Sequence, residues 1–163
     1  MTKEEIYNYL DSLNIWYEIT NHEALYSMED VYNANIPYKE YDGKNLFVRD
    51  SKKRNYYMIF VKGDKRIDLK KFNEKYNTGK LSFASSEDLS SILSLYPGAV
   101  TPLGLLNDKN KIVTLYIDEE FLTKERIVGV HPCDNTATVW MKVDDLIYII
   151  ENHGNKIKYF KGN

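Results

Sequence analysis

Three short segments of the chain carry residues that could do chemistry. Lys44 and Asn45 stand before a strand-like run in "GKNLFVRD", Gly98 and Pro102 bracket a loop, and His131 opens "HPCDNT" between two strand-like runs. A lysine offers a compact cation, a glycine lets backbone N–H groups approach a ligand, and an imidazole can position water. Taken singly, each segment has an ordinary structural interpretation as a solvated lysine, turn punctuation or a strand-end turn.

The signatures of the common enzyme classes are missing from the sequence. It contains no GxGxxG, no P-loop, no GxSxG, no HExxH and no group of Cys and His at zinc spacing. His131 and Cys133 are two residues apart and could share one face of a strand, but they supply at most two metal ligands and no catalytic triad. We therefore expect neither a metal site nor a cofactor.

The elements that would position these residues alternate irregularly between helix and strand. Thr2 and Glu5 form a capping-box pattern, and Ile6, Leu10 and Leu13 recur at helical spacing, which predicts a helix over 3–13. Further helices are predicted from Ser27 to before Pro37, from Asp68 to about residue 76, from Ser85 or Ser86 to Leu95, and over 144–154. Strands are predicted over 15–20, 45–50, 56–63, 80–85, 111–118, 126–130, 136–143 and, at a sheet edge, 156–160.

This pattern favours a mixed α+β domain in which helices surround a largely antiparallel, barrel-like sheet. The 163 residues, 43% of them hydrophobic, suit one compact domain over 1–163. No run approaches the roughly 18 consecutive apolar residues of a membrane helix, and no apolar signal region follows the first residues, so we expect a cytoplasmic protein without a membrane partner. Cys133 is the single cysteine, which excludes an internal disulfide and suits a reducing compartment.

Positive charge is concentrated in one part of the sequence. The net charge is -2, yet residues 44–80 hold 12 Lys and Arg against 4 Asp and Glu, whereas the rest of the chain holds 10 against 20. One interpretation is a solvated hairpin followed by a lysine-rich helix; the other is a surface for a phosphate-bearing partner. Tyr56 and Tyr57 in this region either stack on bases or belong to the core.

Three sequence motifs together resemble one family. "GKNLFVRD", "PGAVTPLGLLND" and "HPCDNTATVW", in this order and at these separations, are similar to the YbaK/ProX family, the free-standing relatives of the editing domain inserted in bacterial prolyl-tRNA synthetases. The opening "MTKEEIYNYLDSLNIWYEITNHEALYSMEDV" is similar to the ProX branch. The resemblance covers nearly the whole chain. It implies trans-editing, the hydrolysis of the ester between a wrong amino acid and the acceptor end of tRNA(Pro), with alanine as the expected amino acid.

The resemblance also implies a set of site residues. The family's lysine and asparagine fall on Lys44 and Asn45, and its histidine falls on His131. Its GxxxP loop falls on Gly98, Ala99, Val100, Thr101 and Pro102. Asn135, in the histidine segment, is a further expected contact to the substrate. Two departures, His22-Glu23-Ala24 in place of His-Pro and Cys133 in place of an aliphatic residue, bear on amino-acid selectivity.

An aminoacyl ester is already activated, so positioning of water and stabilisation of the oxyanion can suffice. In this hypothesis backbone N–H groups of the 98–102 loop hold the ester carbonyl or the amine, and Lys44 anchors a phosphate or ribose of the terminal adenosine. His131 either orients the water or a ribose hydroxyl, or forms a pocket wall. Further walls are expected from segment 131–136 and from Ile36 or Tyr26, because a second sieve must admit alanine and exclude proline.

The residues leave alternatives open. The protein could act on Cys-tRNA(Pro), as the YbaK branch does, or be a non-catalytic module that binds an aminoacyl-tRNA or an amino acid. It could also work bound to prolyl-tRNA synthetase. The basic segment 49–71 is expected to contact the acceptor stem in a salt-sensitive way.

Overall fold

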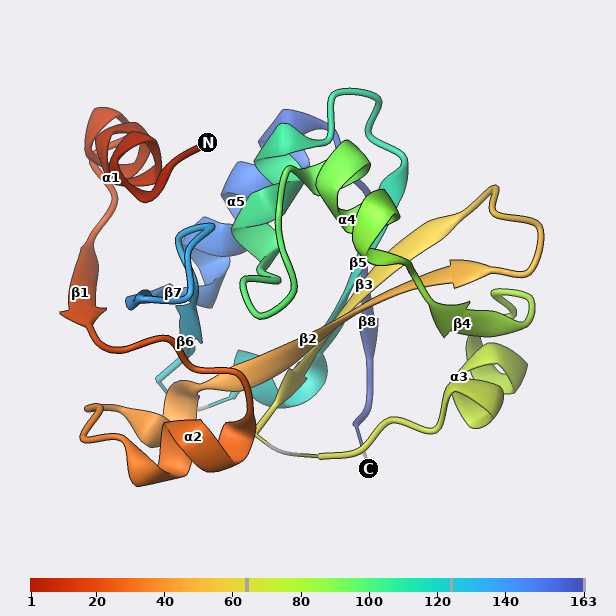
Figure 1. Ribbon diagram of the computed structural model, residues 1–163, viewed down its shortest axis with the longest axis horizontal. Helices are drawn as coiled ribbons and strands as arrows, with labels where there is room; N and C mark the ends of the chain where they lie inside the picture. Colours follow the sequence, from red (N-terminus) through yellow and green to blue (C-terminus); the bar gives the residue numbers. More distant parts are fainter. Residues whose placement is uncertain (64, 124, 163) are drawn as a thin grey trace.

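The computed structural model describes residues 1–63, 65–123 and 125–162, whose strands form two sheets (Figure 1). The strands are β1 (Tyr17–Asn21), β2 (Gly43–Asp50), β3 (Tyr56–Lys62), β4 (Leu81–Phe83), β5 (Val113–Asp118), β6 (Ile127–Val130), β7 (Ala137–Lys142) and β8 (Ile157–Phe160). The larger sheet has the order β4-β2-β3-β5-β8, and the smaller has the order β1-β7-β6.

The helices are α1 (Lys3–Ser12), α2 (Met28–Asn33), α3 (Leu69–Tyr76), α4 (Ser86–Leu93) and α5 (Val143–His153), with 3-10 turns η1 (Lys39–Tyr41), η2 (Pro102–Asn107) and η3 (Glu119–Leu122). Their starts follow local capping chemistry. Thr2 forms a complete capping box with Glu5, Asp68 accepts hydrogen bonds from two N–H groups of α3, and Ser85 caps α4. Gly154 ends α5 at a φ of 114°, which a glycine adopts without strain.

The pairing confirms a mixed α+β fold with mainly antiparallel strands. β2 pairs antiparallel with β3 and β4, and β7 pairs antiparallel with β1 and β6, whereas β5 runs parallel to both β3 and β8. A parallel pair needs a long crossover connection, so chain segments with helices join β3 to β5 and β5 to β8. The expected barrel-like closure is not confirmed, because the described strands lie in two separate sheets with open edges.

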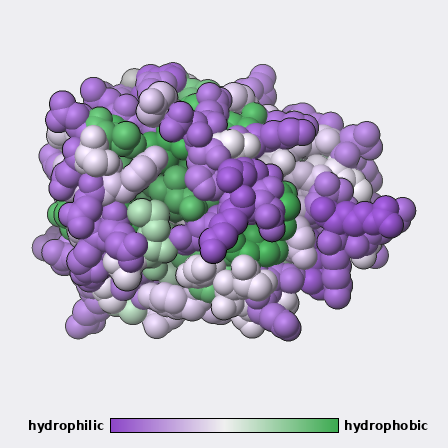
Figure 2. All heavy atoms as spheres, turned by 90° about the horizontal axis from the view of Figure 1, so that it is seen from above, coloured by the Kyte–Doolittle hydropathy of each residue, from purple (hydrophilic) through white to green (hydrophobic). Residues whose placement is uncertain are grey.

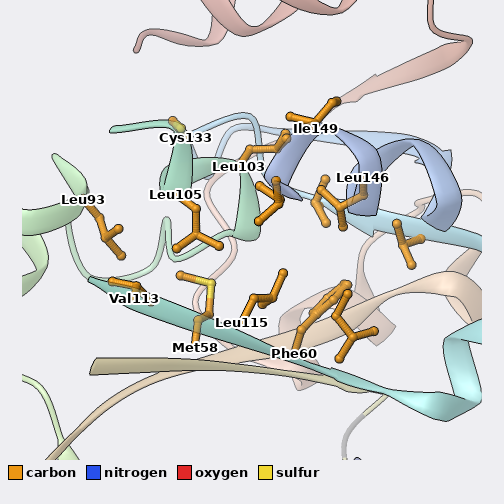
Figure 3. Close-up of a cluster of buried hydrophobic side chains, with 14 of the residues drawn as sticks. Met58, Phe60, Leu93, Leu103, Leu105, Val113, Leu115, Cys133, Leu146 and Ile149 are labelled. Carbon is orange, nitrogen blue, oxygen red and sulfur yellow. The ribbon is translucent and has the colours of Figure 1, made fainter. Parts of the chain in front are cut away.

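The larger sheet is covered on both faces. Alternate residues of β3 divide between two clusters: Met58 and Phe60 face η2 and α5, whereas Ile59 and Val61 pack with Phe72 of α3. Figure 3 shows Met58, Phe60 and Leu115 of the strands facing Leu103, Leu105, Leu146 and Ile149. Seen from above, the surface is mostly hydrophilic, with apolar atoms near its centre (Figure 2). Tyr56 and Tyr57 both pack against these clusters, which favours their core interpretation.

Several predicted boundaries are corrected by the structure. β1 begins at Tyr17 rather than at residue 15, and α4 ends at Leu93 because Ser94 adopts a left-handed conformation with φ 54°. Lys44 lies inside β2 rather than before it, because Gly43 already pairs with Lys62 of β3. The loop after Gly98 contains η2, which Thr101 caps by accepting a hydrogen bond from the Leu103 N–H. β8 lies at a sheet edge, as predicted.

Candidate active site

A cavity of about 300 Å³ lies where the first residues of β2 meet the loop after α4 and the end of β6. Its lining comes from four separate parts of the sequence: Leu25, Tyr26, Ser27, Val31, Asp42, Gly43, Lys44, Asn45, Leu46, Gly98, Val100 and His131. The apolar members come mainly from α2 and the segment before it, and the polar members come mainly from β2 and His131. Such a hollow, apolar on one side and polar on the other, suits a small organic ligand.

The cavity brings together most of the residues singled out in the sequence. Lys44, Asn45, Gly98, Val100 and His131 all line it, although they come from three distant segments. The other predicted residues, Ala99, Thr101, Pro102 and Asn135, are buried and do not line it. Of the two expected wall residues, Tyr26 lines the cavity, whereas Ile36 does not line it and packs in a cluster with Leu25, Val31 and Trp140.

The edge of β2 faces the cavity. β3 pairs with Lys44 and Asn45 on one side of β2, but β4 covers the other edge only from Val48 to Asp50, so no strand of the described chain pairs with Lys44 and Asn45 on that edge. Both side chains are half-buried. The Asn45 Oδ1 atom is fully buried and accepts no hydrogen bond from the described residues. A buried acceptor without a donor is costly, which marks this atom as a contact point for a ligand.

The loop over the cavity is fixed by specific hydrogen bonds. Thr101 Oγ1 donates to the carbonyl oxygen of His131 at 2.6 Å, so the loop and the histidine segment are held together. The Tyr96 hydroxyl donates to Asn135 Oδ1 at 3.0 Å and accepts from the Asn135 N–H at 3.2 Å. Asn135 Nδ2 is buried and has no partner in the described chain. Thr101 and Asn135 therefore support the cavity from behind its wall.

Gly98 is required by its backbone conformation and by its neighbours. Its φ of +95° is rarely adopted by other residues, and a Cβ there would lie 2.9 Å from Tyr26 Cδ1 and 3.1 Å from Asn135 Nδ2. The adjacent Ala99 N–H already donates to the Tyr96 carbonyl. Within the described chain no hydrogen bond uses the N–H of Gly98 or Val100. These two groups are the loop donors that could meet a ligand oxygen.

His131 is held as a neutral ring with one defined tautomer. Its Nδ1 lies 3.0 Å from the carbonyl oxygen of Ala137, and a carbonyl only accepts, so Nδ1 carries the hydrogen and Nε2 is the acceptor. Burial lowers the pKa of His131, and the nearby His22, with ring centroids 6.2 Å apart, acts in the same direction. The ring can therefore accept a hydrogen bond from water or a hydroxyl at neutral pH.

Asp42 is a cavity residue that the sequence reasoning missed. It is only 8% exposed, and its carboxylate accepts a hydrogen bond from the Gly43 N–H at 2.8 Å. Burial raises the pKa of Asp42 to about 6. In the sequence this aspartate follows Tyr41 and precedes a glycine, which is typical of an exposed turn, so no local pattern indicates its burial.

Cys133 does not contribute to the cavity. Its side chain is 9% exposed and packs in the main core, and burial raises the pKa of its thiol to about 11. His22 also lies outside the lining, although its ring neighbours His131. The two departures from the family pattern, at residues 22–24 and at Cys133, therefore lie outside the cavity lining and can affect the cavity only through the residues that support it. No group of three or more His, Cys, Asp or Glu among the described residues could hold a metal ion.

Comparison with known proteins shows which family the chain belongs to. The family model described as the aminoacyl-tRNA editing domain matches residues 22–149, a span that contains every lining residue. The chain belongs to the aminoacyl-tRNA editing domain family. It is 38% identical over 156 residues to the prolyl-tRNA editing protein ProX of Acetoanaerobium sticklandii, covering 96% of this chain and 94% of that protein. It is 28% identical to the prolyl-tRNA synthetase associated domain-containing protein 1 of Mus musculus, over 94% of this chain and 92% of that protein.

Solved structures share the fold of this editing domain. One, provisionally described as a trans-editing enzyme for prolyl-tRNA synthetase, has a TM-score of 0.72 at 18% identity and covers 99% of this chain and 97% of its own. Another, of a hypothetical protein, has a TM-score of 0.70 at 15% identity, with coverages of 97% and 98%. No helix in the part of the chain that the structure describes is long and apolar enough to span a membrane. Family membership identifies the chain as an aminoacyl-tRNA deacylase.

Proposed function

We propose that this editing domain is a trans-editing deacylase that removes alanine from mischarged tRNA(Pro), and that residues 1–163 act as one domain. The observation that carries the proposal is the convergence of Lys44, Gly98 and His131 on one cavity from three distant segments. The 38% identical relative is named a prolyl-tRNA editing protein, which supports proline tRNA as the carrier. The reaction takes place where tRNA is charged, in keeping with the expected cytoplasmic location.

In the proposed reaction the cavity positions a water molecule against an activated ester. The N–H groups of Gly98 and Val100 stabilise the oxyanion, and the neutral His131 ring accepts a hydrogen bond at Nε2 from water or from the ribose 2'-hydroxyl. Lys44 anchors a phosphate or ribose of the terminal adenosine as a cation. Water adds to the carbonyl, the bond to the ribose oxygen breaks, and that oxygen takes up a proton.

Selectivity for alanine follows from the size of the site. The cavity of about 300 Å³ must take the terminal ribose as well as the amino acid, which leaves room for a small side chain against Leu25, Tyr26 and Val31. A proline pocket cannot exclude the smaller alanine strongly, because each missing methylene is worth only about 1–3 kcal/mol, so a second small site must remove the error. Cysteine is also small, and Cys-tRNA(Pro) is the competing substrate.

The basic part of the sequence is proposed to hold the tRNA. A second cavity of about 240 Å³ lies beside α3 and β8, on the sheet face opposite η2 and α5. Its lining comprises four cations, three aromatic residues, Ile67 and one aspartate: Arg66, Lys71, Lys75, Lys161, Phe72, Tyr76, Phe160, Ile67 and Asp68. The Asp68 carboxylate already caps α3, which leaves the basic character dominant. Phosphates of the acceptor stem would fit this charge.

The test is a deacylation assay with alanyl-, cysteinyl- and prolyl-tRNA(Pro). We expect rapid loss of alanine with proline spared, and loss of this activity in Lys44→Ala but not in Lys158→Ala, an exposed lysine on β8. Faster loss of cysteine than alanine would reassign the substrate. Hydrolysis no faster than in buffer would overturn the enzyme proposal and favour a module that only binds charged tRNA. Co-elution with prolyl-tRNA synthetase on gel filtration would show whether that enzyme is a partner.

A further inference from the structure

The carboxylate of Asp42 faces the cavity without a full set of partners. In the described chain the carboxylate accepts a hydrogen bond from the Gly43 N–H alone, at Oδ1. No ion pair among the described residues includes Asp42. Other buried aspartates have side-chain donors: Asp118 accepts a hydrogen bond from the Lys65 ammonium, and Asp108 accepts one from the Asn155 amide. Asp42 therefore retains the capacity to bind a cation.

Besides the Lys44 ammonium and the His131 ring, the cavity has acceptors that suit an ammonium group and donors that suit a carbonyl oxygen. Acceptors lie at the start of β2, where Asp42 has its carboxylate and Asn45 has a buried Oδ1 without a donor. Donors lie on the loop after α4, where no hydrogen bond within the described chain uses the N–H groups of Gly98 and Val100. An aminoacyl ester has the matching arrangement, because its α-ammonium donates and its carbonyl oxygen accepts.

We infer that Asp42, assisted by Asn45 Oδ1, binds the α-ammonium group of the aminoacyl ester. This inference rests on the proposed deacylase function and deepens it. A cation brought against a desolvated carboxylate forms a charge-assisted hydrogen bond, which is stronger than a neutral one. Because the fold already buries the carboxylate, little of the attraction is spent on removing its water.

The inferred contact lets the enzyme recognise an aminoacyl ester whose α-amino group is free. Esters whose nitrogen is acylated, such as peptidyl-tRNA, cannot present a cation to Asp42. An ester in which a hydroxyl replaces the ammonium has the same size as alanine but lacks the charge. Lactyl-tRNA(Pro) is such a substrate, and it separates the charge of the ammonium from the shape of the side chain.

The experiment compares kcat/KM for alanyl- and lactyl-tRNA(Pro) in the wild type and in Asp42→Asn. The ratio of the two values within one variant does not depend on the fraction of folded enzyme. We expect Asp42→Asn to lower the alanyl-to-lactyl ratio on the order of 10- to 100-fold, the range for hydrogen bonds to charged groups. The matched control is Asp50→Asn at the other end of β2, where the aspartate is also 8% exposed but is hydrogen-bonded by Asn55 and the Arg54 N–H.

An unchanged alanyl-to-lactyl ratio in Asp42→Asn would overturn the inference while leaving the deacylase function supported by the wild-type rate. A ratio lowered equally in Asp50→Asn would also overturn it, because the effect would then come from disturbance of β2. If the wild type hydrolyses neither ester, the proposed function fails. The same two tRNAs in a filter-binding assay then decide the inference. Tighter binding of alanyl- than of lactyl-tRNA(Pro) that Asp42→Asn removes would support it, and equal binding of the two by the wild type would contradict it.

Discussion

Some residues of the cavity lower the stability of the folded protein, and Asp42 is the clearest case. Burial raises its pKa to about 6, so the folded state binds the proton more tightly than the unfolded state does. The stability of the wild type therefore falls as the pH rises from about 4 to about 6 and is level above this window. We predict that Asp42→Asn raises the free energy of unfolding by about 1–3 kcal/mol at pH 7.5 and by little at pH 4.

Urea denaturation at the two pH values measures this difference. Asp50→Asn provides a control of opposite sign. Although burial opposes the shift, hydrogen bonds from Asn55 and Arg54 hold the pKa of Asp50 below its usual value, so Asp50→Asn is expected to lose stability at pH 7.5. If Asp42→Asn is less stable than the wild type at pH 7.5, the conclusion that the buried Asp42 carboxylate lowers the stability of the fold is contradicted.

Cys133 allows a second prediction at the residue scale. Because burial raises its thiol pKa to about 11, little thiolate is present near neutral pH. We predict that the folded protein reacts with a disulfide reagent at pH 8 on the order of 100-fold more slowly than a free thiol, which has a pKa near 8.5. One full equivalent should react in urea. Rapid labelling of the folded chain would show that the 131–136 segment opens readily.

At the scale of elements, the loop after α4 depends on Gly98 for both its path and its contacts. Gly98→Ala places a Cβ against Tyr26 and Asn135, whereas Gly63→Ala, also at positive φ (+68°), places one with no atom of the described residues within 4 Å. Both substitutions carry a backbone cost of about 1–2 kcal/mol. We predict that only Gly98→Ala lowers kcat/KM, on the order of 100-fold, because small displacements of catalytic donors are costly.

Thermal melting and deacylation kinetics on both glycine variants check this prediction. The expected outcome is some loss of stability in both variants, larger in Gly98→Ala because of its contacts with Tyr26 and Asn135, and loss of activity only in Gly98→Ala. If Gly63→Ala loses as much activity, the effect is a general one of strained backbone, and the loop N–H groups have no special role in the reaction.

The elements also show which features the sequence could predict. Caps at Thr2, Asp68 and Ser85 and the stop at Gly154 are local, so the helix starts and the end of α5 were predicted closely. Sheet order is not local, since β5 pairs with β3 and β8 across long connections. No local sequence pattern could therefore test the expectation of a barrel-like sheet.

The candidate site divides in the same way. Lys44, Gly98 and His131 were found because their motifs resemble those of a family, and the structure gathers them at one cavity. Asp42 escaped notice because its burial results from tertiary packing around the start of β2, which no spacing in the sequence reveals. Asn135 was expected to contact substrate, and the structure places it behind Gly98, hydrogen-bonded to Tyr96.

On the scale of the whole molecule, the charge is divided between two regions. The basic segment 44–80 contains β2, β3 and α3, and part of its charge is neutralised internally by the Arg49–Asp88 ion pair and the pairs of Lys65 with Asp118 and Glu120. The remaining basic residues include those of the second cavity. A protein with a net charge of only -2 can therefore attract an RNA to one face while the rest of its surface repels it.

This division predicts the salt dependence of activity. Each phosphate contact contributes roughly 0.7–0.9 to the slope of log affinity against log salt. We predict that kcat/KM for alanyl-tRNA(Pro) falls with salt, and that Lys71→Glu combined with Lys75→Glu lowers both the rate at low salt and the magnitude of that slope by about 1–2. The matched control is Lys109→Glu combined with Lys158→Glu, two exposed lysines outside the second cavity. Equal slopes for the two double variants would mean that tRNA is attracted by overall charge and not held at the face that carries α3.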